Sequence, residues 1–343
     1  MNLKHVVIPD VAMQTPLVSI CCFTYNQELY IKQTIESLLM QRTSFPFEII
    51  IHDDASTDNN QQIIKEYAEK YPHIIKPIFQ NENKYSKYGI NYQFANVSRA
   101  ALGRYIAYCD GDDYWIDPLK LQKQVDFLEA NSDYGLVHTK AVVFNEAKMY
   151  FEGSHGYDVL SFEDLLFENS IASLTVCLRT NLLRQYFDEV MPEDYVKWTA
   201  EDFPTWLWFI QHTKIKFMED VTSVYRKRIG SISHIKDDFK RLYFSEGIYD
   251  IVNYYLTNYD LQEKTENKIR ARYYSNMVNM YFLNKNMNGI RESIKIFYDA
   301  KDWLNLLWIV MTSPFYFSRF MIKGSYRMRS NIFNIFKLYP IRK

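Results

Sequence analysis

The first half of the chain alternates between two kinds of hydrophobic pattern. Short, continuous apolar runs are each followed by a longer segment in which apolar residues recur at helical spacing. Strands that are apolar throughout are buried on both faces, which is typical of a parallel sheet covered by helices. The pattern therefore predicts an α/β fold with a doubly wound, mainly parallel sheet. Strands are expected at 17–23, 47–52, 74–80 and 105–109, and helices at 27–40, 59–70, 91–101 and 118–130, the last capped by Asp117 with Pro118 in its first position.

Further along the chain the pattern becomes mixed and then helical. From residue 234 onward nearly every segment has helical spacing. This change predicts a sheet-containing domain over residues 1–235 and a helical C-terminal region over 236–343. Further strands are expected at 135–144, 172–179 and 215–225, helices at 162–167 and 203–213, and breaks between C-terminal helices at 258–260, 284–289 and 313–314.

Composition excludes several classes of protein. Hydrophobic residues make up 48% of the 343, which is enough for a large core and excludes overall disorder. Only 10 glycines and 10 prolines are present, which excludes collagen-like and low-complexity chains. The four cysteines lie in apolar runs without metal-site spacing, so we expect core residues in a reducing compartment. The first residues lack the apolar segment of a secretory signal, so a cytoplasmic location is expected.

The net charge of −1 hides an uneven distribution. Residues 319–343 hold seven of the 40 basic residues and none of the 41 acidic ones, interleaved with aromatic residues. Because Asn305, Pro314 and Arg319 interrupt the apolar stretch before it, a transmembrane helix is not expected. We expect residues 303–343 to lie on an anionic membrane surface, peripheral on its inner face. The alternative is packing on the catalytic domain or in a homodimer; nucleic acid is not an expected partner, because the rest of the chain is acidic.

Polar residues follow the first two predicted strands. Ligands of doubly wound sheets bind beyond the carboxyl ends of the strands. Thr24, Tyr25 and Asn26 follow the first strand, where a plain loop is an equally good interpretation. Asp53 and Asp54 follow the second. Their carboxylates are suited to a base N–H or ribose hydroxyls, although an Asx turn would also explain them.

The sharpest feature is the segment Asp110-Gly111-Asp112-Asp113, which follows the fourth strand. Two carboxylates one residue apart can both reach a hard divalent cation, and the glycine relaxes the backbone between them. Such a cation keeps positions open for water and phosphate oxygens. The alternative, an acidic turn that caps the next helix, is less favoured because Asp117 already fills that role.

Three segments, PLVSICCFTYN, EIIIHDDASTD and GRYIAYCDGDDYWIDPLKLQKQ, carry a family resemblance. Their order and spacing closely resemble the nucleotide-sugar-binding half of family 2 inverting glycosyltransferases, which have the GT-A fold. The resemblance is strong over residues 16–140 and weaker to about residue 235. It implies a GT-A-type doubly wound sheet with a helical C-terminal extension.

The resemblance also implies roles for the acidic residues. Asp53 or Asp54 would contact the nucleoside of a nucleotide-diphosphate sugar, often uridine. Asp110 and Asp112 would form the Asp-x-Asp pair beside the diphosphate, with Asp112 as the more direct ligand of Mn²⁺ or Mg²⁺. Asp113 would touch the donor sugar.

Inverting transfer needs a base that takes the proton of the attacking acceptor hydroxyl. Family members place it in a Glu-Asp pair at a helix start, after the metal motif. This arrangement nominates Asp202 as the base, with Glu201 as the alternative. Ordinary helix capping by Thr199 or Asp202, with Pro204 in the first turn, explains the same residues.

Basic residues follow the last predicted strand of the first domain. Family members often have Tyr-Arg-x-His here, with the histidine in the metal shell, but Arg228 stands in its position. Arg226, Lys227 or Arg228 would then neutralise the diphosphate. His234 is a further candidate metal ligand or an ordinary surface histidine.

The leading hypothesis is a metal-dependent inverting glycosyltransferase in cell-surface polysaccharide synthesis. It would move a sugar from a nucleotide-diphosphate donor, with UDP favoured, to a glycan or lipid-linked oligosaccharide. One alternative is a transferase that acts on polyprenyl phosphate, whose anionic acceptor needs no strong base. Another is a non-catalytic scaffold subunit that binds nucleotide sugars.

Overall fold

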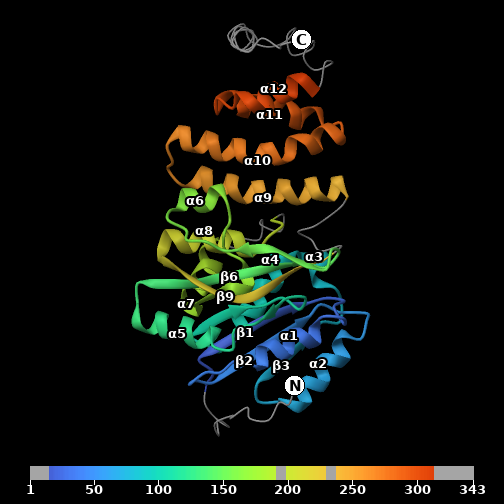
Figure 1. Ribbon diagram of the computed structural model, residues 1–343, viewed down its shortest axis with the longest axis vertical. Helices are drawn as coiled ribbons and strands as arrows, with labels where there is room; N and C mark the ends of the chain where they lie inside the picture. Colours follow the sequence, from blue (N-terminus) through green and yellow to red (C-terminus); the bar gives the residue numbers. More distant parts are fainter. Residues whose placement is uncertain (1–14, 191–197, 229–236, 313–343) are drawn as a thin grey trace. The chain divides into compact units, whose positions relative to one another are not determined.

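The computed structural model of the protein describes residues 15–190, 198–228 and 237–312. The predicted ligand His234 and the basic segment 319–343 lie outside these residues. The chain divides into two compact units, 1–236 and 237–343, which are described separately (Figure 1).

A single mixed sheet forms the centre of the first unit. Its strand order is β3-β2-β1-β4-β8-β6-β9-β5, with β7 paired to β6. The first four of these strands are parallel, and β1 and β2 are buried along almost their whole length. The predicted α/β fold with a mainly parallel first half is therefore confirmed. These strands are β1 (Val18–Thr24), β2 (Phe47–Asp53), β3 (Ile75–Phe79) and β4 (Tyr105–Tyr108).

The second half of the sheet folds back toward the acidic segment. Strand β8 (Cys177–Arg179) runs antiparallel to β4, while β6 (Tyr134–Asn145) and β9 (Lys214–Lys227) pair in parallel. The two-residue strand β5 (Tyr114–Trp115) then pairs antiparallel with β9, Tyr114 opposite Val224. This pairing brings the end of β9 beside Asp112 and Asp113. The remaining strand, β7 (Tyr150–His155), is exposed along most of its length.

Helices cover the sheet because their apolar stripes match its buried faces. Helix α1 (Ile31–Leu39) buries Ile31, Ile35 and Leu38, a spacing of three to four residues that puts them on one face. All four cysteines are buried and unbonded, as the apolar pattern predicted. The other helices of this unit are α2 (Asn60–Lys70), α3 (Lys84–Tyr88), α4 (Ile90–Ala100), α5 (Lys120–Ala130), α6 (Phe162–Phe167), η1 (Ser173–Thr175), α7 (Thr180–Val190) and α8 (Asp202–His212).

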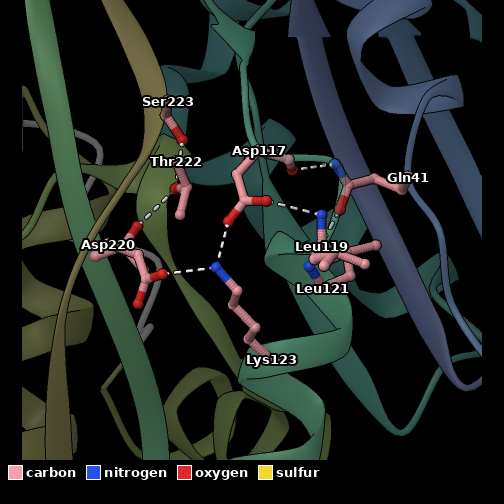
Figure 2. Close-up of polar contacts among 9 residues, drawn as sticks. Gln41, Asp117, Leu119, Leu121, Lys123, Asp220, Thr222 and Ser223 are labelled. Carbon is pink, nitrogen blue, oxygen red and sulfur yellow. Dashed lines mark hydrogen bonds and ion pairs between the residues drawn. The ribbon is translucent and has the colours of Figure 1, made fainter.

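Helix α5 begins two residues later than predicted. Its N-cap is Leu119, so the expected cap at Asp117 is wrong. Figure 2 shows what the Asp117 carboxylate binds: it accepts from the Leu119 N–H at 2.9 Å and from Lys123 Nζ at 2.9 Å. Lys123 Nζ also lies 2.6 Å from Asp220 Oδ1 on β9, and Gln41 Nε2 donates to the Asp117 carbonyl. These bonds fix the segment after the acidic motif to β9 and to the loop that follows α1.

The second unit consists of helices around a small core of its own. They are drawn from orange to red in Figure 1. Leu306 and Ile309 of the last helix are buried in this core together with Tyr274 and Phe297. Within the described ranges no helix is both long and apolar enough to cross a membrane. The helices are α9 (Asp238–Asn258), α10 (Glu263–Leu283), α11 (Met287–Asp299) and α12 (Trp303–Thr312).

Candidate active site

The acidic segment after β4 is pressed against the end of β1. Gly111 N–H donates to the Phe23 carbonyl at 2.8 Å, and Thr34 Oγ1 lies 2.7 Å from the Asp113 carbonyl. A Cβ on Gly111 would come within 2.5 Å of Gln27 Oε1 and 2.7 Å of Thr24 Cβ. Glycine is therefore required here by close approach rather than by backbone freedom, because its φ lies outside the left-handed region.

Two arginines at the end of β9 hold the second and third aspartates. Arg228 Nε lies 2.6 Å from Asp112 Oδ2. The Arg226 N–H donates to Asp113 Oδ1 at 2.7 Å, and its Nε donates to the Asp112 carbonyl, also at 2.7 Å. Burial, then the charges of Asp112 and Asp110, raise the pKa of Asp113, and Arg226 offsets part of this rise. The structure thus brings together the acidic motif and both predicted arginines.

The arginines rest on an aromatic side chain that the sequence analysis missed. The Tyr30 ring lies 4.8 Å from the guanidinium carbon of Arg226 and 5.2 Å from that of Arg228. Tyr30 Oη donates to Glu146 Oε1 at 2.8 Å, and Arg226 Nη2 donates to Gln33 Oε1 at 2.7 Å. Tyr30 is the N-cap residue of α1 and Gln33 lies in its first turn, and their spacing of three residues at a helix start was the available signal.

The Glu201–Asp202 pair begins helix α8. Glu201 occupies the N-cap position without a side-chain capping bond, so capping by Thr199 or Asp202 in that position is wrong. Asp202 lies in the first turn, where its Oδ1 accepts from the Phe203 N–H at 2.6 Å. A carboxylate is favoured at this end of a helix by the helix dipole.

Electrostatics connect this pair to the acidic motif about ninety residues earlier in the chain. Burial, then the charges of Asp112 and Asp202, raise the pKa of Asp110 to about 7. Burial raises the pKa of Asp202 to about 6, and burial with the charges of Asp202 and Asp110 raises that of Glu201. The carboxyl groups of Asp110, Asp112, Glu201 and Asp202 are partly buried, and their charges interact at the carboxyl end of β4.

Asp53 has a different environment. It is fully buried at the end of β2. Its Oδ1 accepts from the Ser56 N–H at 2.9 Å and Gln61 Nε2 at 2.7 Å, and its Oδ2 accepts from Asn60 Nδ2 at 2.7 Å. The Asp53 side chain thus bonds an N–H three residues on, one residue further than in the Asx turn that the sequence left open, and it holds the loop after β2 in a similar way. These bonds occupy both oxygens of the Asp53 carboxylate.

Asp54 and the residues after β1 also make bonds within the protein. The Asp54 oxygens accept from the N–H groups of Lys84 and Tyr85 at 2.7 and 3.0 Å. Asn26 has a φ of 50°, and its Oδ1 accepts from the Thr57 N–H at 2.8 Å. The loops that follow β1, β2 and β3 are joined in this way. Thr24 is buried, while Tyr25 is 44% exposed at the loop surface.

The carboxylates near β4 suit a divalent cation, although they do not enclose one by themselves. In the described part of the chain, no group of three or more His, Cys, Asp or Glu side chains is placed to hold a metal. Asp110 and Asp112 supply hard oxygen ligands. Burial first, and then the charges of Asp112 and Asp202, raise the pKa of Asp110, and a bound cation would offset both effects. They fit a two-carboxylate site whose remaining ligands would be water and phosphate oxygens.

The strand order and the acidic motif at the sheet edge define a GT-A-type glycosyltransferase fold. Residues 19–189 match the family described as glycosyl transferase family 2. One relative is the Escherichia coli UDP-Glc:alpha-D-GlcNAc-diphosphoundecaprenol beta-1,3-glucosyltransferase WfaP. It is 31% identical over 234 residues, covering 66% of this chain and 82% of WfaP. The chain belongs to glycosyl transferase family 2.

Other similar proteins include one further relative in sequence and two solved structures. An uncharacterized protein of Mycobacterium tuberculosis is 35% identical over 231 residues, and the chain spans 60% of its length. Staphylococcus aureus TarS, solved with UDP-GlcNAc, has a TM-score of 0.57 at 22% identity, covering 82% of this chain and 80% of that one. Mannosyltransferase PcManGT from Pyrobaculum calidifontis, solved with GDP-Man and Mn²⁺, has a TM-score of 0.54 at 14% identity, covering 96% and 82%. These two likenesses establish the shared fold.

Proposed function

We propose that the protein is a metal-dependent inverting glycosyltransferase that builds a cell-surface polysaccharide. It would transfer a hexosyl group from a nucleotide-diphosphate sugar to a glycan or lipid-linked oligosaccharide. The observation that carries the proposal is the convergence of Asp110 and Asp112 with Glu201 and Asp202 at one end of the sheet. Metal ligands and a nearby base are the two kinds of group that such a transfer needs.

The residues around Asp112 would bind the diphosphate. Asp110 and Asp112 would hold Mn²⁺ or Mg²⁺, which neutralises the leaving diphosphate when bound. Arg226 and Arg228, held beside Asp112 by Tyr30, add fixed positive charge on the same side. The Asp113 carboxylate accepts from the Arg226 N–H and so would hold Arg226 in position. Asp113 would also touch the donor sugar.

Asp202 would act as the base. The acceptor hydroxyl gives its proton to the Asp202 carboxylate while its oxygen attacks the anomeric carbon opposite the diphosphate, whose bond to that carbon breaks. A pKa of about 6 leaves Asp202 ionised near neutral pH and more basic than an ordinary aspartate. Glu201, the alternative base, has its pKa raised also by the charge of Asp202, so its carboxyl is the weaker candidate.

Relatives support UDP as the favoured nucleotide. WfaP is named for a UDP-Glc donor and a diphosphoundecaprenol-linked acceptor, and TarS was solved with UDP-GlcNAc. The nucleoside would lie against the loops after β1 and β2, which carry Thr24, Tyr25, Asn26, Asp53 and Asp54. Since both Asp53 oxygens bind within the protein, its part would be to position these loops.

The direct test is turnover by the purified full chain with a panel of nucleotide sugars. Donor hydrolysis or transfer is measured with Mn²⁺, with Mg²⁺ and with EDTA. Asp112→Asn should abolish turnover, while Asp133→Asn, an exposed partner of Lys214, serves as the charge-matched control. Full activity of Asp112→Asn in EDTA would contradict the mechanism. Binding of UDP without any turnover would favour a non-catalytic scaffold subunit. Transfer to polyprenyl phosphate by Asp202→Asn would favour the alternative of a transferase that acts on polyprenyl phosphate.

Membrane association through residues 303–343 is a separate proposal. Leu306 and Ile309 of α12 are buried in the helical core, which favours packing for the first part of this segment. The basic aromatic residues from 319 onward are then the candidates for an anionic surface. Co-sedimentation with phosphatidylglycerol liposomes should be lost when Arg319, Lys323, Arg327 and Arg329 are replaced by glutamine. Equal binding by both proteins would discard this role.

A further inference from the structure

The predicted metal ligand Asp112 already has a cationic partner. Arg228 Nε lies 2.6 Å from Asp112 Oδ2, and their side chains are only 21% and 15% exposed. An ion pair with so little exposure is screened much less than a surface pair. Asp110 and Asp113 stand beside Asp112 in the motif, so the positive charge of Arg228 offsets the negative charge of neighbouring carboxylates.

A divalent cation and this arginine compete for the same oxygen. Mg²⁺ binds carboxylate oxygens at about 2.0–2.1 Å, inside the distance that now separates Oδ2 from Nε. Two cations on one oxygen also repel each other. In the described residues no third acidic, histidine or cysteine ligand completes a site that could outcompete Arg228. A metal ion alone is therefore expected to bind weakly.

Arg228 has a second attachment that does not depend on Asp112. Its guanidinium carbon lies 5.2 Å from the centre of the Tyr30 ring, and Glu146 holds the Tyr30 hydroxyl in place at 2.8 Å. A guanidinium on an aromatic face keeps its planar donors for a phosphate, which it can bind through two bonds. The arginine can thus leave Asp112 without leaving the site.

We propose that Arg228 is an exchangeable counter-ion of Asp112, which yields Oδ2 to the divalent cation and then pairs with the diphosphate of the donor. This inference rests on the proposed metal and diphosphate site and adds a coupling to it. Metal binding frees the arginine for the nucleotide, and the nucleotide removes the competitor of the metal. Each ligand should therefore tighten the binding of the other, by the same factor in both directions.

The test measures Mn²⁺ binding by electron paramagnetic resonance and UDP binding by calorimetry, each alone and together. In Arg228→Gln, Mn²⁺ alone should bind about 3- to 10-fold more tightly than in the wild type, as expected for loss of a competing ion pair. UDP with saturating Mn²⁺ should bind about 10-fold more weakly, because a charge-assisted bond is lost. The mutual tightening should shrink accordingly.

Lys227→Gln is the matched control. It removes one positive charge from the adjacent residue, whose Nζ pairs with Glu152 at 3.2 Å rather than with the motif. An equal gain in Mn²⁺ affinity in this control, or no gain in Arg228→Gln, would overturn the exchange. Should Arg228→Gln not fold, Arg228→Lys is used, and unchanged coupling there would count against the proposal. If the wild type binds no Mn²⁺ even with UDP, the metal site itself fails, a result distinct from a missing gain.

Discussion

Two acidic clusters that look alike in the sequence lie at the same edge of the sheet, on either side of β1. Asp53 and Asp54 follow β2, and each accepts two or more hydrogen bonds from N–H groups of the protein. Asp110 and Asp112 follow β4, where burial, and then the charges of neighbouring carboxylates, raise the pKa of Asp110 to about 7. The first cluster is satisfied by its own chain, whereas the second is crowded with like charge.

This difference separates a structural role from a ligand-binding one. Buried carboxylates whose oxygens receive N–H bonds are stable as ions and join loops together. Carboxylates that repel each other in a buried site cost stability until a cation or a proton relieves them. The comparison therefore predicts opposite outcomes for the same Asp→Asn change at the two clusters.

Among changes that spare the metal ligands, the largest effect is expected at Asp202. Asp202→Asn removes the base but keeps the size of the side chain, so transfer should fall by about 10²- to 10⁴-fold. Thermal unfolding should show that the protein is still folded, and UDP binding with Mn²⁺ should be kept. A tenfold loss or less would assign the base to Glu201, which Glu201→Gln would then test.

A loss of stability is expected at Asp53. Asn60 Nδ2 and Gln61 Nε2 both donate to its carboxylate. In Asp53→Asn the new side-chain NH₂ group would face one of these donors and make no hydrogen bond with it. Leaving such a buried group unpaired costs about 1–3 kcal/mol of unfolding free energy. Urea unfolding measures the change, with the exposed Asp133→Asn expected within about 0.5 kcal/mol of the wild type. Equal stability of the two variants would contradict the structural role.

The pH profile of transfer tests the state of the base. Because Asp202 must be ionised and burial raises its pKa to about 6, kcat/KM should fall as the pH drops through 6. About tenfold should be lost between pH 7 and pH 5. A midpoint near 4, the ordinary value for aspartate, would show that this carboxyl is not perturbed in the working enzyme.

A gain in stability is expected at Asp110 in the metal-free protein. Its folded pKa of about 7 lies above the ordinary value of 3.8, so the folded state binds more protons between these pH values and loses stability as the pH rises through them. In EDTA at pH 8, Asp110→Asn should therefore unfold with a free energy higher by on the order of 1 kcal/mol, with little change at pH 4. Destabilisation at pH 8 would instead show that Asp110 has a structural role like that of Asp53.

Much of the fold could be predicted because the responsible patterns are strong. The strands that became β1, β2 and β4 are continuous apolar runs, and the structure places them within a residue of the expected bounds. The two-residue β5 is too short for any periodicity, and the exposed β7 has no buried face to produce one. Helix α7 was missed although Leu183, Tyr186, Phe187 and Val190 have helical spacing, so its pattern was available.

The residues of the candidate site could be predicted from the sequence, but the contacts between them could not. The acidic motif and the Glu201–Asp202 pair are local in sequence, and the family resemblance supplied their roles. The Arg228–Asp112 pair and the Tyr30 support depend on β9 pairing with β5, directly after the acidic motif, which no local pattern encodes. The need for Gly111 likewise arises from the approach of Thr24 and Gln27, which only the packed loops reveal.

The contrast between the two acidic clusters is tested most directly by counting bound Mn²⁺ at saturating UDP with electron paramagnetic resonance. The comparison uses the wild type, Asp112→Asn and Asp54→Asn, all confirmed as folded. We predict one tightly bound Mn²⁺ per chain for the wild type and Asp54→Asn, and none for Asp112→Asn. Retention of Mn²⁺ by Asp112→Asn, or its loss only in Asp54→Asn, would contradict the assignment of the metal to the carboxylates that follow β4.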